Sequence, residues 1–97
     1  MNEQELIAKE KLIVELEDNL IKEFILLRKG KKITQKELAE QSRMIRATVN
    51  RIERCLTSPT IGTMIKLLEP LGYTLKIVPL KKETNKKHEK EGRKNEK

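Results

Sequence analysis

The sequence predicts a small, mostly α-helical domain with one short β-strand near its C-terminal end. Residues 35–54 read QKELAEQSRMIRATVNRIER, where apolar and small residues are spaced as two short helices crossing over a tight turn require. The composition is 38% charged and 36% hydrophobic with two aromatic residues, which suits a helical protein better than a β-sandwich. Residues 73–78 are rich in β-branched and aromatic residues that partly alternate with others, which is typical of a strand. A chain of 97 residues supports one such domain, and we expect a homodimer because small domains bury little surface alone.

The sequence pattern of residues 3–29 predicts a helical N-terminal region. From Glu3 to Lys29 there is no Pro or Gly, and apolar residues recur at spacings of three, four and seven. Asp18 or Asn19 could cap a helix within this stretch. The pattern therefore allows either one long helix or a first helix to about Leu16 and a second from Leu20.

The helix-turn-helix comes next. Gly30 is expected to end the preceding helix, because glycine adopts positive φ at little cost. Thr34 with Glu37 three residues later forms a capping-box pattern, which predicts a helix start. This helix should run to about Gln41, and a turn should lead into a second helix over residues 45–54.

The two faces of this motif differ in chemistry. The inner face and the turn consist of Leu38, Ala39, Ser42, Met44, Val49 and Ile52. The outer face of the second helix consists of Arg46, Ala47, Thr48, Asn50 and Arg51. These outer groups suit base edges and phosphates, and residues 28–54 hold nine basic against three acidic groups. The motif therefore predicts DNA binding.

A further helix and the predicted strand complete the domain. Pro59 disfavours helix at Ser58, and Thr60 can cap a helix over residues 61–71 that Gly72 ends. The strand over residues 73–78, closed by Pro79, has no partner strand in the chain, although its backbone groups need partners. It could pair with a second copy or add to a sheet of another protein, or it could be a solvated extended arm. The candidate dimerisation residues are Tyr73, Leu75, Ile77 and Val78.

Charge divides the chain into regions. Residues 1–19 carry two Lys and six acidic residues, residues 20–80 twelve basic and five acidic, and residues 81–97 eight basic and four acidic. We expect an acidic helical segment over 1–19, the DNA-binding domain over 20–72, a dimerisation strand over 73–80 and a basic disordered tail over 81–97. The apolar stripe of residues 1–17 needs cover, either from its own domain or from another chain. The tail either solvates the protein or adds non-specific affinity for nucleic acid.

Several classes of function are disfavoured. Cys55 is the single cysteine, which excludes an internal disulfide or multi-thiolate zinc site and fits a reducing compartment. There is no signal peptide and no run of about 20 apolar residues, so we expect a cytoplasmic protein without membrane contact. His88 stands alone, and no catalytic set or carboxylate pair is indicated. We expect neither enzyme activity nor a cofactor or metal.

The chain resembles the helix-turn-helix repressors of the Xre/Cro class over roughly residues 20–75. The resemblance rests on ITQKELA at residues 33–39, TVNRIER at 48–54 and SPT at 58–60. Its length, the helical leader and the terminal YTLKIV make it look more narrowly like the HigA-type antitoxins of bacterial toxin–antitoxin pairs. The resemblance implies a five-helix domain with an N-terminal helical extension and a C-terminal strand used in dimerisation.

The resemblance also implies roles for residues. The DNA-contacting set would be Gln35, Lys36, Arg43, Arg46, Ala47, Thr48, Asn50 and Arg51. Arg28 and Glu53 would form a structural ion pair that holds the recognition helix. The sequence departs from the family pattern at Arg43 and Cys55, where the family has Gly, and at Ile45, where a Ser or Thr would cap the helix. A left-handed residue other than glycine costs about 1 kcal/mol or more, so either the turn at Arg43 is drawn differently or the domain tolerates strain. The missing cap at Ile45 costs about another 1 kcal/mol.

The function implied is that of an antitoxin. A homodimer would bind palindromic operator DNA and repress its own operon, and would neutralise a HigB-type mRNA-cleaving toxin, in a heterotetramer. Such a nuclease would be basic, so the acidic leader is its natural contact. The candidate toxin-contact residues are Leu6, Glu10, Ile13 and Glu17. The alternatives are a stand-alone repressor of the same fold without a toxin partner, and an interaction module whose motif no longer reads DNA.

Overall fold

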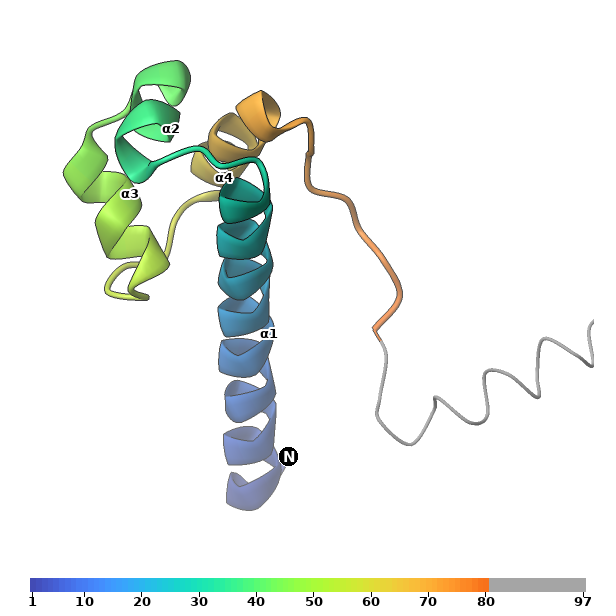
Figure 1. Cartoon of the computed structure of the whole chain (residues 1–97). Coiled ribbons are helices and arrows are strands. Elements are labelled where there is room, and N and C mark those ends of the chain that lie inside the picture. The colour runs from blue at the N-terminus through green and yellow to red at the C-terminus, as the bar shows by residue number, and fades with distance from the viewer. Residues whose placement is uncertain (81–97) are drawn as a thin grey trace, which may run out of the picture.

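The computed structural model describes residues 1–80, which form four α-helices and one short 3₁₀ helix (Figure 1). The elements are α1 (Glu3–Gly30), α2 (Gln35–Ser42), α3 (Arg46–Glu53), α4 (Ile61–Leu68) and the 3₁₀ helix η1 (Glu69–Leu71). The short elements cluster around one end of α1, and the rest of α1 projects away as a single helix (Figure 1). Every residue of this protruding half of α1, residues 3–16, is exposed. The predicted disorder of residues 81–97 lies outside the described part of the chain.

The prediction of five helices and a C-terminal strand was wrong. Residues 3–30 form one uninterrupted helix, so the leader and the first helix of the domain are a single element. Asp18 and Asn19 do not start a new helix, because a single polar residue costs a helix only tenths of a kcal/mol and no Pro or Gly interrupts the ladder there. The N-cap is instead Asn2, whose side chain accepts a hydrogen bond from the Glu5 N–H at 2.7 Å.

The last helix is shorter than predicted. α4 ends at Leu68, and the chain continues as the 3₁₀ helix η1, with Pro70 in its first turn. Proline has no N–H to donate and its ring clashes with the carbonyl four residues earlier, so the α-helical ladder cannot pass through it. Gly72, with φ 87°, then ends η1.

The predicted strand is an extended segment without a ladder. No residue between 1 and 80 is in a strand, and residues 72–80 have no neighbouring extended segment to pair with. Leu75 is half-buried against the core, whereas Ile77 is 96% exposed. Alternation and β-branched content favour extended backbone, but a strand also requires a partner, which this segment lacks within the described residues.

The core joins one end of α1 to the other helices. Phe24 on α1, Leu38 on α2, Ile52 on α3 and Leu67 on α4 are all at most 1% exposed. The buried apolar residues are Ile21, Phe24, Leu38, Ala39, Val49, Ile52, Met64, Leu67, Leu68 and Leu71. The first residue of α1 that packs against this core is the partly buried Leu20, so the protruding half contributes nothing to it.

The same backbone motif ends α1, α2, α3 and the continuous segment formed by α4 and η1. A residue with left-handed backbone follows the helix, and the next N–H bonds to a carbonyl five residues earlier, as in a Schellman motif. The left-handed residues are Lys32, Arg43, Cys55 and Gly72, with φ of 58°, 59°, 59° and 87°. The closing bonds are Ile33 N to Arg28 O, Met44 N to Ala39 O, Leu56 N to Arg51 O and Tyr73 N to Leu68 O, at 3.2, 2.8, 2.9 and 3.1 Å.

The helix ends at Gly30 as expected, but Gly30 does not adopt the positive φ expected of it. Gly30 is the last residue of α1, and the left-handed residue falls two positions later, at Lys32. Three of the four left-handed positions carry a side chain, which strains the backbone there by about 1 kcal/mol each.

Candidate nucleic-acid interface

The α2–α3 unit holds one face of α3 against the core and presents the other. Val49 and Ile52 are buried on the inner side, where Leu38 and Ala39 of α2 are buried with them. On the other side Arg46, Ala47 and Arg51 are exposed, and Thr48 and Asn50 are half-buried. Guanidinium groups, an amide and a hydroxyl thus share the outward face of one short helix.

A buried ion pair fixes α3 to α1. The Arg28 Nε donates to Glu53 Oε2 at 2.7 Å, and its Nη2 donates to Oε1 at 2.9 Å, so the contact is bidentate. The remaining Arg28 nitrogen, Nη1, donates to the carbonyl of Ile33 at 2.8 Å, in the connection between α1 and α2. The two side chains are only 9% and 6% exposed. One guanidinium therefore fixes α1, the α1–α2 connection and the end of α3.

The same carboxylate organises two polar side chains. Gln35 Nε2 donates to Glu53 Oε1 at 2.8 Å, and Asn50 Nδ2 donates to Gln35 Oε1 at 3.2 Å. These bonds use one N–H of each amide. Asn50 keeps its second N–H and its carbonyl oxygen, which are the donor and acceptor that an adenine edge requires.

The N-terminus of α2 is capped from within. Thr34 Oγ1 accepts from the Glu37 N–H at 3.0 Å, and Glu37 Oε1 accepts from the Thr34 N–H at 2.9 Å. The N–H groups of Gln35 and Lys36 have no partner within the helix and can reach an anion.

The turn between the two helices is atypical in two respects. Arg43 is exposed and left-handed, and its side chain adds a positive charge at the end of α2. Ile45 occupies the N-cap of α3, where no side-chain hydrogen bond is made, and is itself exposed.

The other candidate residues lie outside the α2–α3 unit. Leu6, Glu10 and Ile13 are exposed on the protruding half of α1, and Glu17 is half-buried just after it. The candidate dimerisation residues lie in the extended segment after η1; Tyr73, Ile77 and Val78 are exposed and Leu75 is half-buried.

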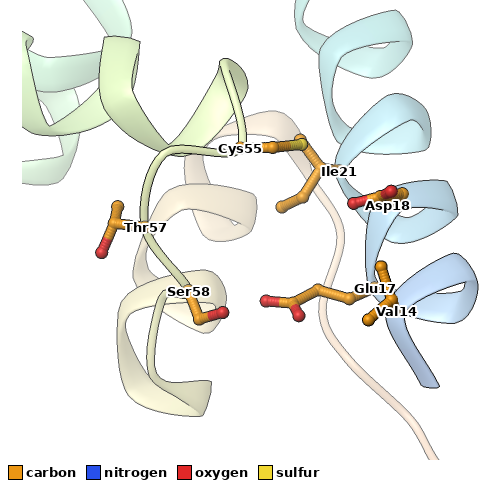
Figure 2. A pocket seen from close by; sticks show the side chains of 7 residues that line it. All are labelled: Val14, Glu17, Asp18, Ile21, Cys55, Thr57 and Ser58. Atoms are coloured by element: carbon orange, nitrogen blue, oxygen red, sulfur yellow. The ribbon is translucent and has the colours of Figure 1, made fainter. Parts of the chain in front are cut away.

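Cys55 lies beside a hollow of about 160 Å³ between α1 and the loop after α3. Figure 2 shows its side chain turned toward Ile21 and Asp18, while Glu17 reaches toward Ser58. Partial desolvation raises the pKa of the Cys55 thiol, and the carboxylates of Asp18 and Glu17 raise it further. The thiol is therefore protonated at neutral pH and is a poor nucleophile.

Sequence reasoning did not find the hydrogen bonds of the Gln35 side chain. This side chain links Glu53 to Asn50, and its contact with DNA stays a prediction. No sequence pattern pairs residues that are 15 and 18 positions apart, so only the packing of α2 on α3 reveals this link.

The fold and the polar face of α3 define a helix-turn-helix domain of the DNA-binding kind. The chain belongs to the Xre-type helix-turn-helix family, whose model matches residues 25–78, more than half of its length. This family consists of DNA-binding transcription regulators rather than enzymes.

A relative supports this assignment. The chain is 47% identical over 62 residues to an uncharacterized HTH-type transcriptional regulator of Haemophilus influenzae, covering 64% of this chain and 63% of the relative. The chain thus spans less than two thirds of that relative's length. No solved structure matches the chain. Within residues 1–80, no helix combines the length and apolar character needed to cross a bilayer.

Proposed function

We propose that this protein is a repressor that binds a palindromic operator in its own promoter as a homodimer, with α3 in the major groove. The observation that carries the proposal is the chain of hydrogen bonds from Arg28 through Glu53 and Gln35 to Asn50. It orients an amide on the outward face of α3 with one donor and one acceptor free, beside the exposed Arg46 and Arg51. Preorganised groups of this kind read base edges at low entropic cost.

The remaining candidates would contact the phosphate backbone. Lys36 and Arg43 carry exposed positive charges, and the α2 N-terminus offers two free N–H groups. These contacts position the domain without reading sequence, whereas Arg46, Thr48, Asn50 and Arg51 supply specificity.

A salt titration against promoter DNA tests this function. Because each neutralised phosphate releases counterions, log K should fall steeply with log salt, by about 0.9 for each phosphate contacted. An unrelated duplex of the same length should bind more weakly at every salt concentration. Equal affinity for both duplexes, or no salt dependence, would instead favour an interaction module that no longer reads DNA.

Replacing Arg43 with glycine should separate stability from DNA affinity. We expect Arg43→Gly to raise the free energy of unfolding by about 1 kcal/mol, because glycine relieves the left-handed strain. It should also lower operator affinity and reduce the salt slope by about 1, because one phosphate contact is lost. Urea denaturation and the salt titration measure the two effects.

Cys55→Gly is the matched control. It removes the same backbone strain at φ 59° but no charge. The free energy of unfolding of Cys55→Gly should rise by a similar amount, and this variant should bind the operator as tightly as the wild type does. If both variants bind DNA equally well, Arg43 does not contact the backbone.

We also propose that the protein is an antitoxin for a basic mRNA-cleaving toxin, forming a heterotetramer with it. The protruding half of α1 supports this, because it exposes apolar side chains beside acidic ones; Leu6 and Ile13 are 49% and 62% exposed. An isolated helix of this length is marginally stable in water, so a partner would stabilise it. The toxin would contact Leu6, Glu10, Ile13 and Glu17. A small basic protein of about 90 to 120 residues in the neighbouring reading frame would favour the antitoxin over a stand-alone repressor.

Deleting residues 1–17 tests the toxin contact. No residue of α1 before Leu20 packs against the core, so the truncated chain should stay folded, with a helical circular dichroism signal reduced only by the loss of residues 3–17 from α1. Its affinity for the co-expressed toxin should fall at least about tenfold, because charge complementarity and apolar burial are both lost. Calorimetry of toxin binding measures this, and unchanged affinity would exclude the leader as the contact.

A further inference from the structure

An apolar groove lies beside α1 at the base of its protruding half. It has a volume of about 300 Å³ and runs between α1 and the start of α4. Its apolar walls include Leu16, Leu20, Ile61, Met64 and Leu75, and Glu17 also lines it. Ile61 on its rim is 72% exposed, so the groove is uncovered in the single chain.

The C-terminal arm, which we define as residues 73–80, exposes apolar side chains that nothing covers in the single chain. Leu75 is its last residue against the body, and the chain then leaves α1 (Figure 1). Beyond Leu75 the side chains of Ile77, Val78 and Leu80 are exposed. Within the described chain, residues 74–80 make no backbone hydrogen bond to another residue. Fixing the conformation of a segment costs conformational entropy, and only contacts made by the segment can offset that cost.

We propose that the arm of a second copy fills this groove, and that each copy does so reciprocally to form an arm-exchanged homodimer. The inference rests on the homodimer of the proposed function and identifies the surfaces that form it. The exposed apolar side chains of the arm would then be buried in the apolar groove of the other copy. Such self-complementary exchange around a two-fold axis is an economical route to a dimer.

Charge favours this arrangement over the other self-pairings. The arm carries Lys76 and no acidic residue, whereas residues 1–19 carry six acidic residues and two Lys. Pairing two α1 leaders would bring like charges together, and so would pairing two arms, whereas an arm on a leader joins opposite charges. Glu17 at the groove is placed to pair with Lys76 of the second copy.

The docking does not require a β-ladder. The arm would be held by side chains on a helical surface, and Pro79 has no N–H that needs a partner. In this dimer Glu17 is taken up by the arm, whereas Leu6, Glu10 and Ile13 do not line the groove and stay available to a toxin.

Disulfide trapping between two different full-length variants tests the proposal. In a Cys55→Ser background, one protein carries Leu16→Cys and the other Val78→Cys. Mixing them under mild oxidation should give the mixed disulfide as the main cross-linked species, which is intermolecular by construction. Lys22→Cys, on an exposed position of α1 outside the groove, replaces Leu16→Cys as the matched control and should cross-link at least about tenfold less.

A variant with Ile77→Ser, Val78→Ser and Leu80→Ser provides the second measurement. These residues are exposed and outside the core, so the fold should be kept. Light scattering should show a dissociation constant for the dimer raised at least about tenfold. A wild type that is itself a monomer would overturn the homodimer of the proposed function. A wild-type dimer that gives no mixed disulfide and survives the arm substitutions would overturn the arm exchange alone.

Discussion

Arg28→Ala is expected to lower the free energy of unfolding by about 3 to 5 kcal/mol. The Arg28–Glu53 pair is almost fully buried, with side chains 9% and 6% exposed. Removing the guanidinium leaves the Glu53 carboxylate with Gln35 as its hydrogen-bond partner, and it also removes the donor to the carbonyl of Ile33. A buried charge without its counter-charge costs far more than the intact pair contributes.

Urea denaturation of three variants measures this effect. Lys29→Ala removes an exposed charge from the next position of α1 and should change stability by less than about 0.5 kcal/mol. Arg28→Lys keeps the charge but loses the bidentate fork. It should lower the free energy of unfolding by more than Lys29→Ala and by less than Arg28→Ala. A loss below about 1 kcal/mol in Arg28→Ala would mean that the pair behaves like one on the surface.

The helix-turn-helix could be predicted because its signals are local. The capping box of Thr34 and Glu37 starts α2 as expected, and the spacing of Leu38, Val49 and Ile52 sets the buried faces of α2 and α3. Each signal lies within one or two helical turns, where sequence spacing and spatial proximity coincide.

The errors arose where distant parts of the chain decide the outcome. Residues 73–78 have the composition of a strand, but a strand needs a partner that the described chain does not supply. Gly30 has the freedom to end a helix, yet the closing bond from Ile33 to Arg28 places the left-handed residue at Lys32. The link from Glu53 to Asn50 exists only because α2 packs on α3.

Arg46→Ala and Arg51→Ala should each weaken operator binding by about 1 to 3 kcal/mol if the arginine contacts a base. Both side chains are exposed on the outward face of α3, one at its first residue and one near its last turn. Electrophoretic mobility shifts with the operator and with single-base variants measure the losses. Lys66→Ala, which removes an exposed charge from α4, is the control and should bind within about twofold of the wild type.

The pattern of losses across operator variants assigns each arginine to a base or a phosphate. An arginine that reads guanine loses discrimination at one base-pair position when it is removed, and the salt slope changes little. An arginine on a phosphate weakens all sequences about equally and reduces the salt slope by about 1. Because Asn50 is oriented through Gln35, Gln35→Ala should relax specificity at the position that Asn50 reads, with little effect in an Asn50→Ala background. Wild-type binding by both arginine variants would mean that α3 does not lie in the groove.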